Sequence, residues 1–112
     1  MNFEKYEVDI EQPKYPKKPF ISKNPTVEQA RKYADDFEIY NKQLAEYRKE
    51  QNRYNDRANE LRELFFNDAF EELGIDKDHP KSDILKKMAW EHGPSSGYYE
   101  VFYWLEELSQ LL

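Results

Sequence analysis

Residues 26–74 read TVEQARKYADDFEIYNKQLAEYRKEQNRYNDRANELRELFFNDAFEELG, and no proline or glycine occurs in this segment before Gly74. Proline and glycine are the residues that most strongly disfavour a helix interior, so their absence predicts one continuous helix of 47 residues from Val27 to Leu73. Such a helix would span about 70 Å at 1.5 Å per residue. The Asn and Asp side chains of residues 51–56 compete for backbone hydrogen bonds, so a kink or break there is the alternative.

Both ends of this predicted helix carry the residues that stop and start helices. Thr26 is followed three residues later by Gln29, which is the spacing of a capping box. At the other end, Gly74 and the apolar Ile75 match a Schellman stop. The sequence therefore predicts both boundaries as well as the helix.

Two series of residues recur every seven positions along this helix. The first series is Ala30, Phe37, Leu44, Gln51, Ala58 and Phe65, and the second is Tyr33, Tyr40, Tyr47, Tyr54 and Leu61. The second series follows the first by three residues, which is the a/d spacing of a coiled coil. The seam is narrow over its first half and widens after Ala58, so we expect a homodimer through the first half and a globular head around the second.

The first 25 residues form a separate segment, an extended arm rich in Pro and Lys. Pro13, Pro16 and Pro19 recur every three residues, which is the period of a polyproline II helix. Because polyproline II segments dock on aromatic grooves, this arm is a second candidate to cover the tyrosines of the long helix, and a foreign protein is a third. Nearer the N-terminus, alternating apolar residues are typical of a short strand: Tyr6, Val8 and Ile10.

The last 39 residues supply two shorter helices, at about 80–92 and 98–111, with Ser95 or Ser96 as the N-cap of the second. The expected class is all-α: a long helix, about 26–73, leads into a small three-helix head, and an extended arm precedes it. The expected domains are the arm, 1–25, and one helical domain, 26–112. The core residues that we expect from the three helices are Leu61, Phe65, Ile84, Leu85, Met88, Ala89, Val101, Trp104, Leu105, Leu108 and Leu112.

Part of the C-terminal region resembles a known family. Ala89-Trp90-Glu91-His92-Gly93 is followed by Ser95, Ser96-Gly97 and Glu100-Val101. These residues, with His79-Pro80-Lys81 before them, resemble the signature of a small uncharacterised family of tailed-bacteriophage proteins. The resemblance covers about residues 60–112, with Pro94 as a departure in the turn. It implies a phage origin and the host-cell cytoplasm, and it brings no known activity and no catalytic residue.

Few residues in the chain could carry catalysis or bind a cofactor. There is no Cys, and the only histidines, His79 and His92, lack the spacing of a metal site. We expect His92 to interact with the negative, C-terminal end of its helix dipole. The alternative is a metal site or an acid–base pair with Glu91 and Glu100, but no motif supports it. The chain has only three glycines, and the sequence contains no glycine-rich phosphate-binding loop. The sequence therefore predicts no enzyme activity, no metal and no cofactor.

The aromatic content instead favours protein–protein contacts. The chain has nine Tyr, seven Phe and two Trp, and aromatic side chains dominate binding hot spots. The interface candidates are Tyr33, Phe37, Tyr40, Leu44, Tyr47, Tyr54, Trp90, Tyr99 and Tyr103. For Trp90, a position at the edge of the core is the alternative to a role in an interface.

The charge of the chain narrows the range of partners. A net charge of −6 and a pI of about 5.0 argue against direct nucleic-acid binding, and no apolar run could span a membrane. The expected partner is a second copy or another protein of the host or phage. An acidic inhibitor that imitates DNA and blocks a nucleic-acid enzyme is the alternative, although acids and bases interleave along the long helix.

Overall fold

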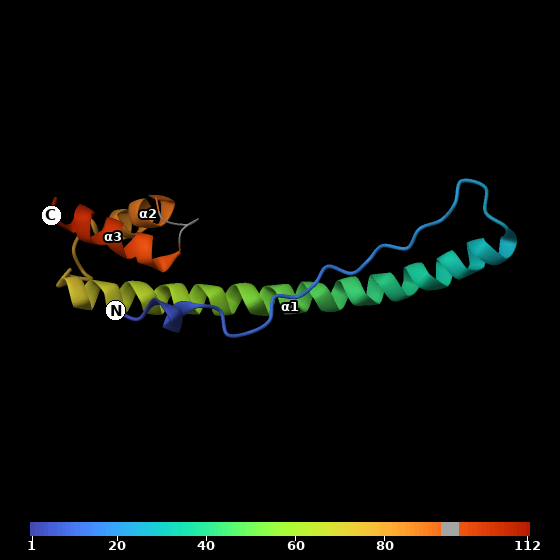
Figure 1. The fold of residues 1–112 in the computed structure, drawn as a ribbon, viewed down its shortest axis with the longest axis horizontal. Helices are drawn as coiled ribbons and strands as arrows, with labels where there is room; N and C mark the ends of the chain where they lie inside the picture. The colour runs from blue at the N-terminus through green and yellow to red at the C-terminus, as the bar shows by residue number, and fades with distance from the viewer. Residues whose placement is uncertain (93–96) are drawn as a thin grey trace. The chain divides into compact units, whose positions relative to one another are not determined.

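The structure is a computed structural model that describes residues 1–92 and 97–112. It contains a 3₁₀ helix, η1 (Phe3–Tyr6), and three α-helices: α1 (Val27–Leu73), α2 (Ser82–His92) and α3 (Tyr98–Ser109). The described residues form no strand, so the all-α prediction is confirmed (Figure 1).

The ends of α1 are those predicted from the sequence, and the hydrogen bonds explain them. The backbone amide of Thr26 donates to Oε1 of Gln29 at 2.9 Å, and the amide of Gln29 donates to Oγ1 of Thr26 at 3.2 Å. These two bonds make a complete capping box. At the C-terminal end, the amide of Ile75 donates to the carbonyl of Phe70 at 2.8 Å, and Gly74 adopts a φ of 70°. That pattern is a Schellman motif, which requires a positive φ at the glycine position.

The helix is continuous through residues 51–56, where a break was the alternative. The side-chain amide of Gln51 donates to Oδ1 of Asn55, one turn later, at 3.1 Å. Because these polar side chains bond each other along the helix surface, they do not take hydrogen bonds away from the backbone.

The residues pack into two compact units. Their boundaries differ from the predicted boundary between the arm and the helical domain, which lies between residues 25 and 26. The first unit, called the head here, comprises residues 1–9 and 58–112. The second, called the stem, comprises residues 10–57. The division falls within α1, because the first nine residues of the arm belong to the head and the rest of the arm packs on the N-terminal half of the helix.

The head has a core in which large aromatic and aliphatic side chains are fully enclosed. Its largest fully buried side chains are Phe65, Phe70, Val101 and Leu105. Leu61, Phe66, Ala69, Leu85 and Ala89 are also buried. The predicted contributions of Leu61, Phe65, Leu85, Ala89, Val101 and Leu105 are therefore confirmed.

Three predicted core residues are wrong. Ile84 and Met88 of α2 are 58% and 40% exposed, and Leu112 is also exposed. Helix α2 is rotated so that Ser82, Leu85 and Ala89 face inward. The Lys86 ammonium lies 5.4 Å from the Phe70 ring centroid, so its aliphatic side chain covers apolar surface of α1.

In α3, Trp104 and Leu108 are half-buried at the edge of the core. Both residues therefore pack against the core as expected, but neither is fully buried. Gly97 occupies the N-cap position of α3, with a φ of 84° and no side-chain cap. Ser95 and Ser96, which the sequence favoured as caps, lie outside the described residues, as does Pro94.

The N-terminal residues of the head form a helical turn, so the predicted strand around Tyr6 is wrong. The alternation that suggested it has a different cause. Tyr6 is buried in the head core, Val8 and Ile10 are half-buried, and the acidic residues between them are exposed. The turn is capped by Asn2, whose Oδ1 accepts a hydrogen bond from the amide of Glu4 at 3.1 Å.

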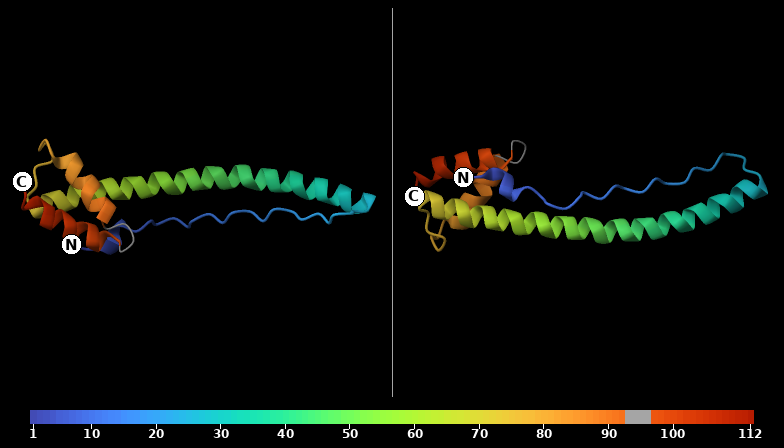
Figure 2. Two further views of the ribbon diagram at one scale, coloured as in Figure 1. Left: turned by 90° about the horizontal axis from the view of Figure 1, so that it is seen from above. Right: turned by 60° about the horizontal axis from the view of Figure 1, so that its bottom comes forward.

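In the stem, the arm runs alongside α1 in the opposite direction, as the views in Figures 1 and 2 agree. It has no regular hydrogen-bonded structure from residue 11 to residue 22. The chain reverses at residues 23–26, where Pro25 precedes the capping residue Thr26. This reversal places the prolines of the arm beside the tyrosines of the helix.

Candidate functional site

The first candidate site is the stripe of apolar residues on the stem part of α1, named here the tyrosine stripe: Tyr33, Phe37, Tyr40, Leu44, Tyr47 and Tyr54. Tyr40 is buried, and the other five residues are half-buried within a single chain. Neighbouring rings contact along the helix, with centroids 5.8 Å apart for Tyr33–Phe37 and for Phe37–Tyr40. The seam that the sequence left without a cover is therefore covered in this structure by the arm.

The prolines of the arm form the face that covers the stripe. Pro13, Pro16 and Pro19 are half-buried, and the two residues that follow Pro13 and Pro16 are exposed in each case. This is the burial pattern of a polyproline II segment with one face docked, because its side chains repeat every three residues. Of the three candidates to cover the stripe, the structure shows the chain's own arm.

Tyr15 adds a polar contact and an aromatic contact to this docking. Its hydroxyl oxygen lies 3.3 Å from that of Tyr40, within hydrogen-bonding distance, and its ring centroid lies 5.1 Å from that of Tyr47 in an edge-on arrangement. The hydrogen bond with Tyr15 and partial desolvation raise the pKa of Tyr40. Sequence reasoning missed Tyr15, although its place between two prolines of the three-residue repeat was a usable signal.

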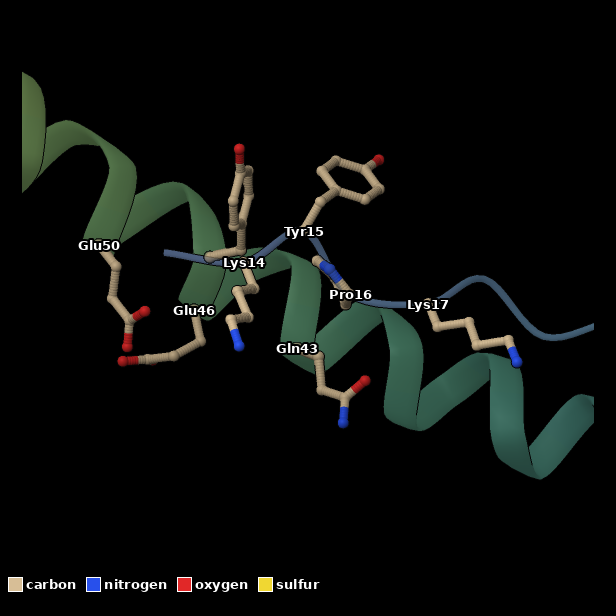
Figure 3. Close-up of a pocket in the computed structure, with 8 residues that line it drawn as sticks. Lys14, Tyr15, Pro16, Lys17, Gln43, Glu46 and Glu50 are labelled. Atoms are coloured by element: carbon tan, nitrogen blue, oxygen red, sulfur yellow. The ribbon is translucent and has the colours of Figure 1, made fainter. Parts of the chain in front are cut away.

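Shallow open hollows line the junction between the arm and the helix. The hollow in Figure 3 has a volume of about 450 Å³, and its walls include Lys14 and Lys17 from the arm and Glu46 and Glu50 from α1. Lys14 and Glu46 point to the same side of the helix. Opposite charges on the two walls favour a docked arm, but at this exposure each contributes little.

A buried tyrosine anchors the other end of the arm in the head. The Tyr6 hydroxyl donates to Oδ2 of Asp68 at 2.6 Å, and Lys5 Nζ lies 3.4 Å from the same oxygen. The Tyr6 ring contacts Phe65 and Tyr98, with centroids 5.3 and 5.7 Å apart. Burial and the bond to Asp68 raise the pKa of Tyr6, whereas the same bond and Lys5 lower the pKa of Asp68. These shifts follow from contacts that hold the arm in place.

The second candidate site is the outer face of α3, named here the α3 face: Tyr99, Tyr103, Glu106 and Glu107. Tyr99 and Tyr103 lie one turn apart and are 70% and 50% exposed, whereas Val101 and Leu105 on the opposite side are fully enclosed. The Tyr99 ring meets the Phe3 ring in an edge-on arrangement, with centroids 5.7 Å apart. Sequence reasoning identified both tyrosines, because one short helix cannot bury five aromatic residues in a small head.

Trp90 lies at the edge of the core. Its ring is half-buried between Phe66 and Tyr98, with centroids 6.3 and 5.9 Å away. The Arg62 guanidinium lies 5.1 Å from its centroid, within the range of a cation–π contact. These neighbours give Trp90 a structural role.

Neither histidine lies in a metal-binding arrangement. Nδ1 of His79 accepts a hydrogen bond from the amide of Lys81 at 3.0 Å, which stabilises the turn before α2. The His92 ring stacks on Trp104, with centroids 4.6 Å apart. No group of three or more His, Cys, Asp or Glu in the described part of the chain could hold a metal ion. Across residues 1–92 and 97–112, every helix is too short or too polar to cross a bilayer.

Residues 6–112 match a protein family described as "Family of unknown function (DUF8546)". The chain belongs to this family. The matched region begins at the anchor Tyr6 and includes the rest of the arm, the long helix and all of the head except residues 1–5. No curated protein and no solved structure matches the chain. The arm from Tyr6 onward, the tyrosine stripe and the α3 face therefore all lie within the part of the chain that matches the family.

Charge is distributed unequally between the two units. The head carries 15 acidic and 6 basic side chains, for a formal charge of −9. The stem carries 8 acidic and 11 basic side chains, for a formal charge of +3. The overall charge of −6 is therefore the sum of a negative head and a positive stem. The sequence analysis did not detect this difference, because it considered the charge of the whole chain and of the long helix only.

Proposed function

We propose that this member of the family is a non-enzymatic interaction protein of a tailed bacteriophage, which acts by protein–protein contact in the cytoplasm of the host cell. The phage origin and the location rest on the resemblance of the C-terminal residues. The mode of action rests on the structure. The observation that carries it is the α3 face, where two tyrosines of an otherwise well-packed helix remain in solvent.

Two physical arguments connect this face to binding. Tyrosine combines a large apolar ring with a hydroxyl, and it immobilises few torsion angles when it is buried in an interface. Tyr99 and Tyr103 are also spaced by one helical turn, so a partner can contact both along a single ridge.

The homodimer through the long helix remains a prediction, but the basis for it has changed. It was expected because the tyrosine stripe needed a cover, and in the structure the arm covers the stripe. Two copies could pair along this seam only after their arms had left it. We therefore propose that the α3 face, which requires no such rearrangement, makes the first contact with a partner.

Capture with matched variants tests the proposal. Wild-type protein, Tyr99→Ser/Tyr103→Ser and the control Ile84→Ser/Met88→Ser would be immobilised and exposed both to lysate from phage-infected cells and to a tagged second copy. The control removes two other exposed apolar side chains, Ile84 and Met88 of α2. We expect one stoichiometric protein to be retained by wild type and by the control but lost with the tyrosine variant. Equal retention by all three proteins, or retention by none, would contradict the proposal.

The alternative function is inhibition of a nucleic-acid enzyme by the acidic head, and the formal charge of −9 on this unit favours it. Carboxylates that occupy a DNA-binding groove must compete with DNA. This alternative predicts that the captured protein is a nucleic-acid enzyme and that added duplex DNA releases it. A captured partner that DNA does not displace would exclude it.

A further inference from the structure

The outer edge of the arm carries a second exposed surface, named here the Phe20 edge: Lys17, Lys18, Phe20 and Lys23. Since the prolines of the arm face the helix, the residues between them must face solvent. Phe20 is 89% exposed, more than any other large apolar side chain among the described residues. It follows directly after Pro19, whose ring is half-buried.

The charge of this edge is uniform. Residues 12–25 contain four lysines and no acidic residue. Lys17, Lys18 and Lys23 form no ion pair with any other described residue, although Asp36 borders the same hollow as Lys17 and Lys18. The contrast with Lys5 is informative, because Lys5 belongs to the same arm and is held by Asp68. None of the three lysines of the Phe20 edge is therefore held in an ion pair within the described part of the chain.

The α3 face has the complementary chemistry. Helix α3 contains three glutamates and no basic residue, and Glu106 and Glu107 are exposed close to Tyr103. Its aromatic ridge offers rings on which an exposed Phe can pack and over which lysine ammonium groups can lie. Its carboxylates offer the opposite charge to the three lysines.

We propose that the Phe20 edge of one copy docks on the α3 face of a second copy, so that the stem of each chain contacts the head of the other. This inference rests on the proposed function, since it names the partner of the α3 face. Two observations select a second copy: the two surfaces match in charge and in aromatic character, and both are exposed on the same chain. A two-fold axis that relates the two copies makes this contact twice and closes the assembly as a dimer.

This mode of association differs from the coiled-coil dimer predicted from the heptad seam. It leaves the arm docked on the tyrosine stripe and uses residues that are exposed in the single chain. It also predicts a dependence on ionic strength, because exposed charges are screened over about 10 Å at 0.1 M salt and about 3 Å at 1 M. A seam of buried tyrosines would not be weakened by salt in this way.

The first experiment measures the mass of the full-length protein by light scattering over a range of concentrations. Wild-type protein is expected to form dimers that dissociate as salt is raised. Phe20→Ser should raise the dissociation constant at least about tenfold, the size of effect seen when an interface anchor is removed. Val27→Ser is the control, because Val27 is another exposed apolar residue of the stem. Neither substitution removes a buried side chain, so both variants are expected to fold, and circular dichroism would verify this.

The second experiment reverses the charges on each side. Lys17→Glu/Lys18→Glu and Glu106→Lys/Glu107→Lys should each fail to dimerise alone, and an equimolar mixture should recover a mixed dimer. Lys42→Glu/Lys49→Glu, which makes the same change in net charge on exposed positions of α1, should dimerise as wild type does. Failure of Glu106→Lys/Glu107→Lys alone, together with recovery in the mixture, cannot come from a general effect of net charge, because this variant is less negatively charged than wild type.

The outcomes separate this inference from the proposed function. A wild-type protein that is monomeric at every concentration overturns the inference, as does a dimer that is unaffected by Phe20→Ser. In either case, capture of a different protein that depends on Tyr99 and Tyr103 leaves the proposed function in place. If no retained protein depends on these two tyrosines, the proposed function fails.

Discussion

The head and the stem share one helix but cover its apolar residues in different ways. In the head, α1 is apolar around much of its circumference, and η1, α2 and α3 enclose Phe65 and Phe70 completely. In the stem, the same helix carries one narrow stripe, and a single extended segment leaves most of it half-buried. The width of the apolar surface therefore determines how many neighbours a helix needs.

The comparison also explains why a proline-rich segment suffices in the stem. A polyproline II segment needs no hydrogen bonds to hold its shape, and its stiff backbone loses little conformational freedom on docking. The three proline rings and Tyr15 of the arm are enough to cover the narrow tyrosine stripe, so no second helix is needed. The head, which must exclude water from entire phenylalanine rings, requires the denser packing of several helices.

The largest predicted effect is in the head. Phe65→Ala should reduce the free energy of unfolding by about 3–5 kcal/mol, because it leaves a cavity that rigid neighbours cannot fill. Tyr40→Ala, at the most buried position of the stripe, should have a smaller effect, because the arm can move into the space. Urea denaturation monitored by circular dichroism would measure both. Equal losses would contradict the difference in packing between the two units.

The second prediction concerns the docking of the arm. Replacing Pro13, Pro16 and Pro19 together by Ser should cost about 2 kcal/mol, because it removes three half-buried rings and makes the free arm more flexible. At about 4–8 °C per kcal/mol, this corresponds to a clear decrease in Tm. Replacing the exposed Lys14 and Lys18 by Ser is the matched control and should leave Tm nearly unchanged. An unchanged Tm in the triple variant would mean that the arm does not stabilise the stem.

The third prediction tests the head anchor. Tyr6→Phe should cost about 1 kcal/mol at neutral pH, since it removes the hydrogen bond to Asp68 and keeps the buried ring. This bond lowers the pKa of Asp68 in the folded state, so its contribution is present above the usual carboxyl pKa of 3.8 and is lost as pH falls through the lower folded value. The stability difference between wild type and Tyr6→Phe should therefore shrink in acid. A difference that stays constant down to acidic pH would contradict the proposed role of Asp68.

The smallest predicted effect concerns the hydrogen bond between Tyr15 of the arm and Tyr40 of the stripe. Tyr15→Phe removes the hydroxyl that raises the pKa of Tyr40. The pKa of Tyr40 should then move down towards its usual value of 10.0, with little change in Tm. Ultraviolet titration of the tyrosines in both proteins would detect the shift. The Tyr6 hydroxyl, in the other unit, should titrate as in wild type.

Much of the fold could be predicted from local signals. The capping box at Thr26 and the Schellman stop at Gly74 fix the ends of α1 through contacts within a few residues, and both predictions are confirmed. The three-residue repeat of the prolines likewise determines which face of the arm can dock. These features need no knowledge of the rest of the molecule.

The errors occur where distant packing decides between local alternatives. Helix α2 has apolar residues on two adjoining faces, and its rotation follows from the fit of Trp90 and Lys86 against the aromatic residues of α1. Tyr6 lies in a 3₁₀ turn instead of a strand, and its hydroxyl donates a hydrogen bond to Asp68, which is 62 positions away in the sequence.

The central claim is that the chain covers its own tyrosine stripe with its own prolines. Isotope-filtered NMR on a mixture of labelled and unlabelled protein tests it most directly, because it separates contacts within a chain from contacts between chains. We predict nuclear Overhauser effects between the Pro16 ring and the Tyr47 ring, which line the same hollow, within one chain only. Their absence, or their appearance only between labelled and unlabelled chains, would contradict the account.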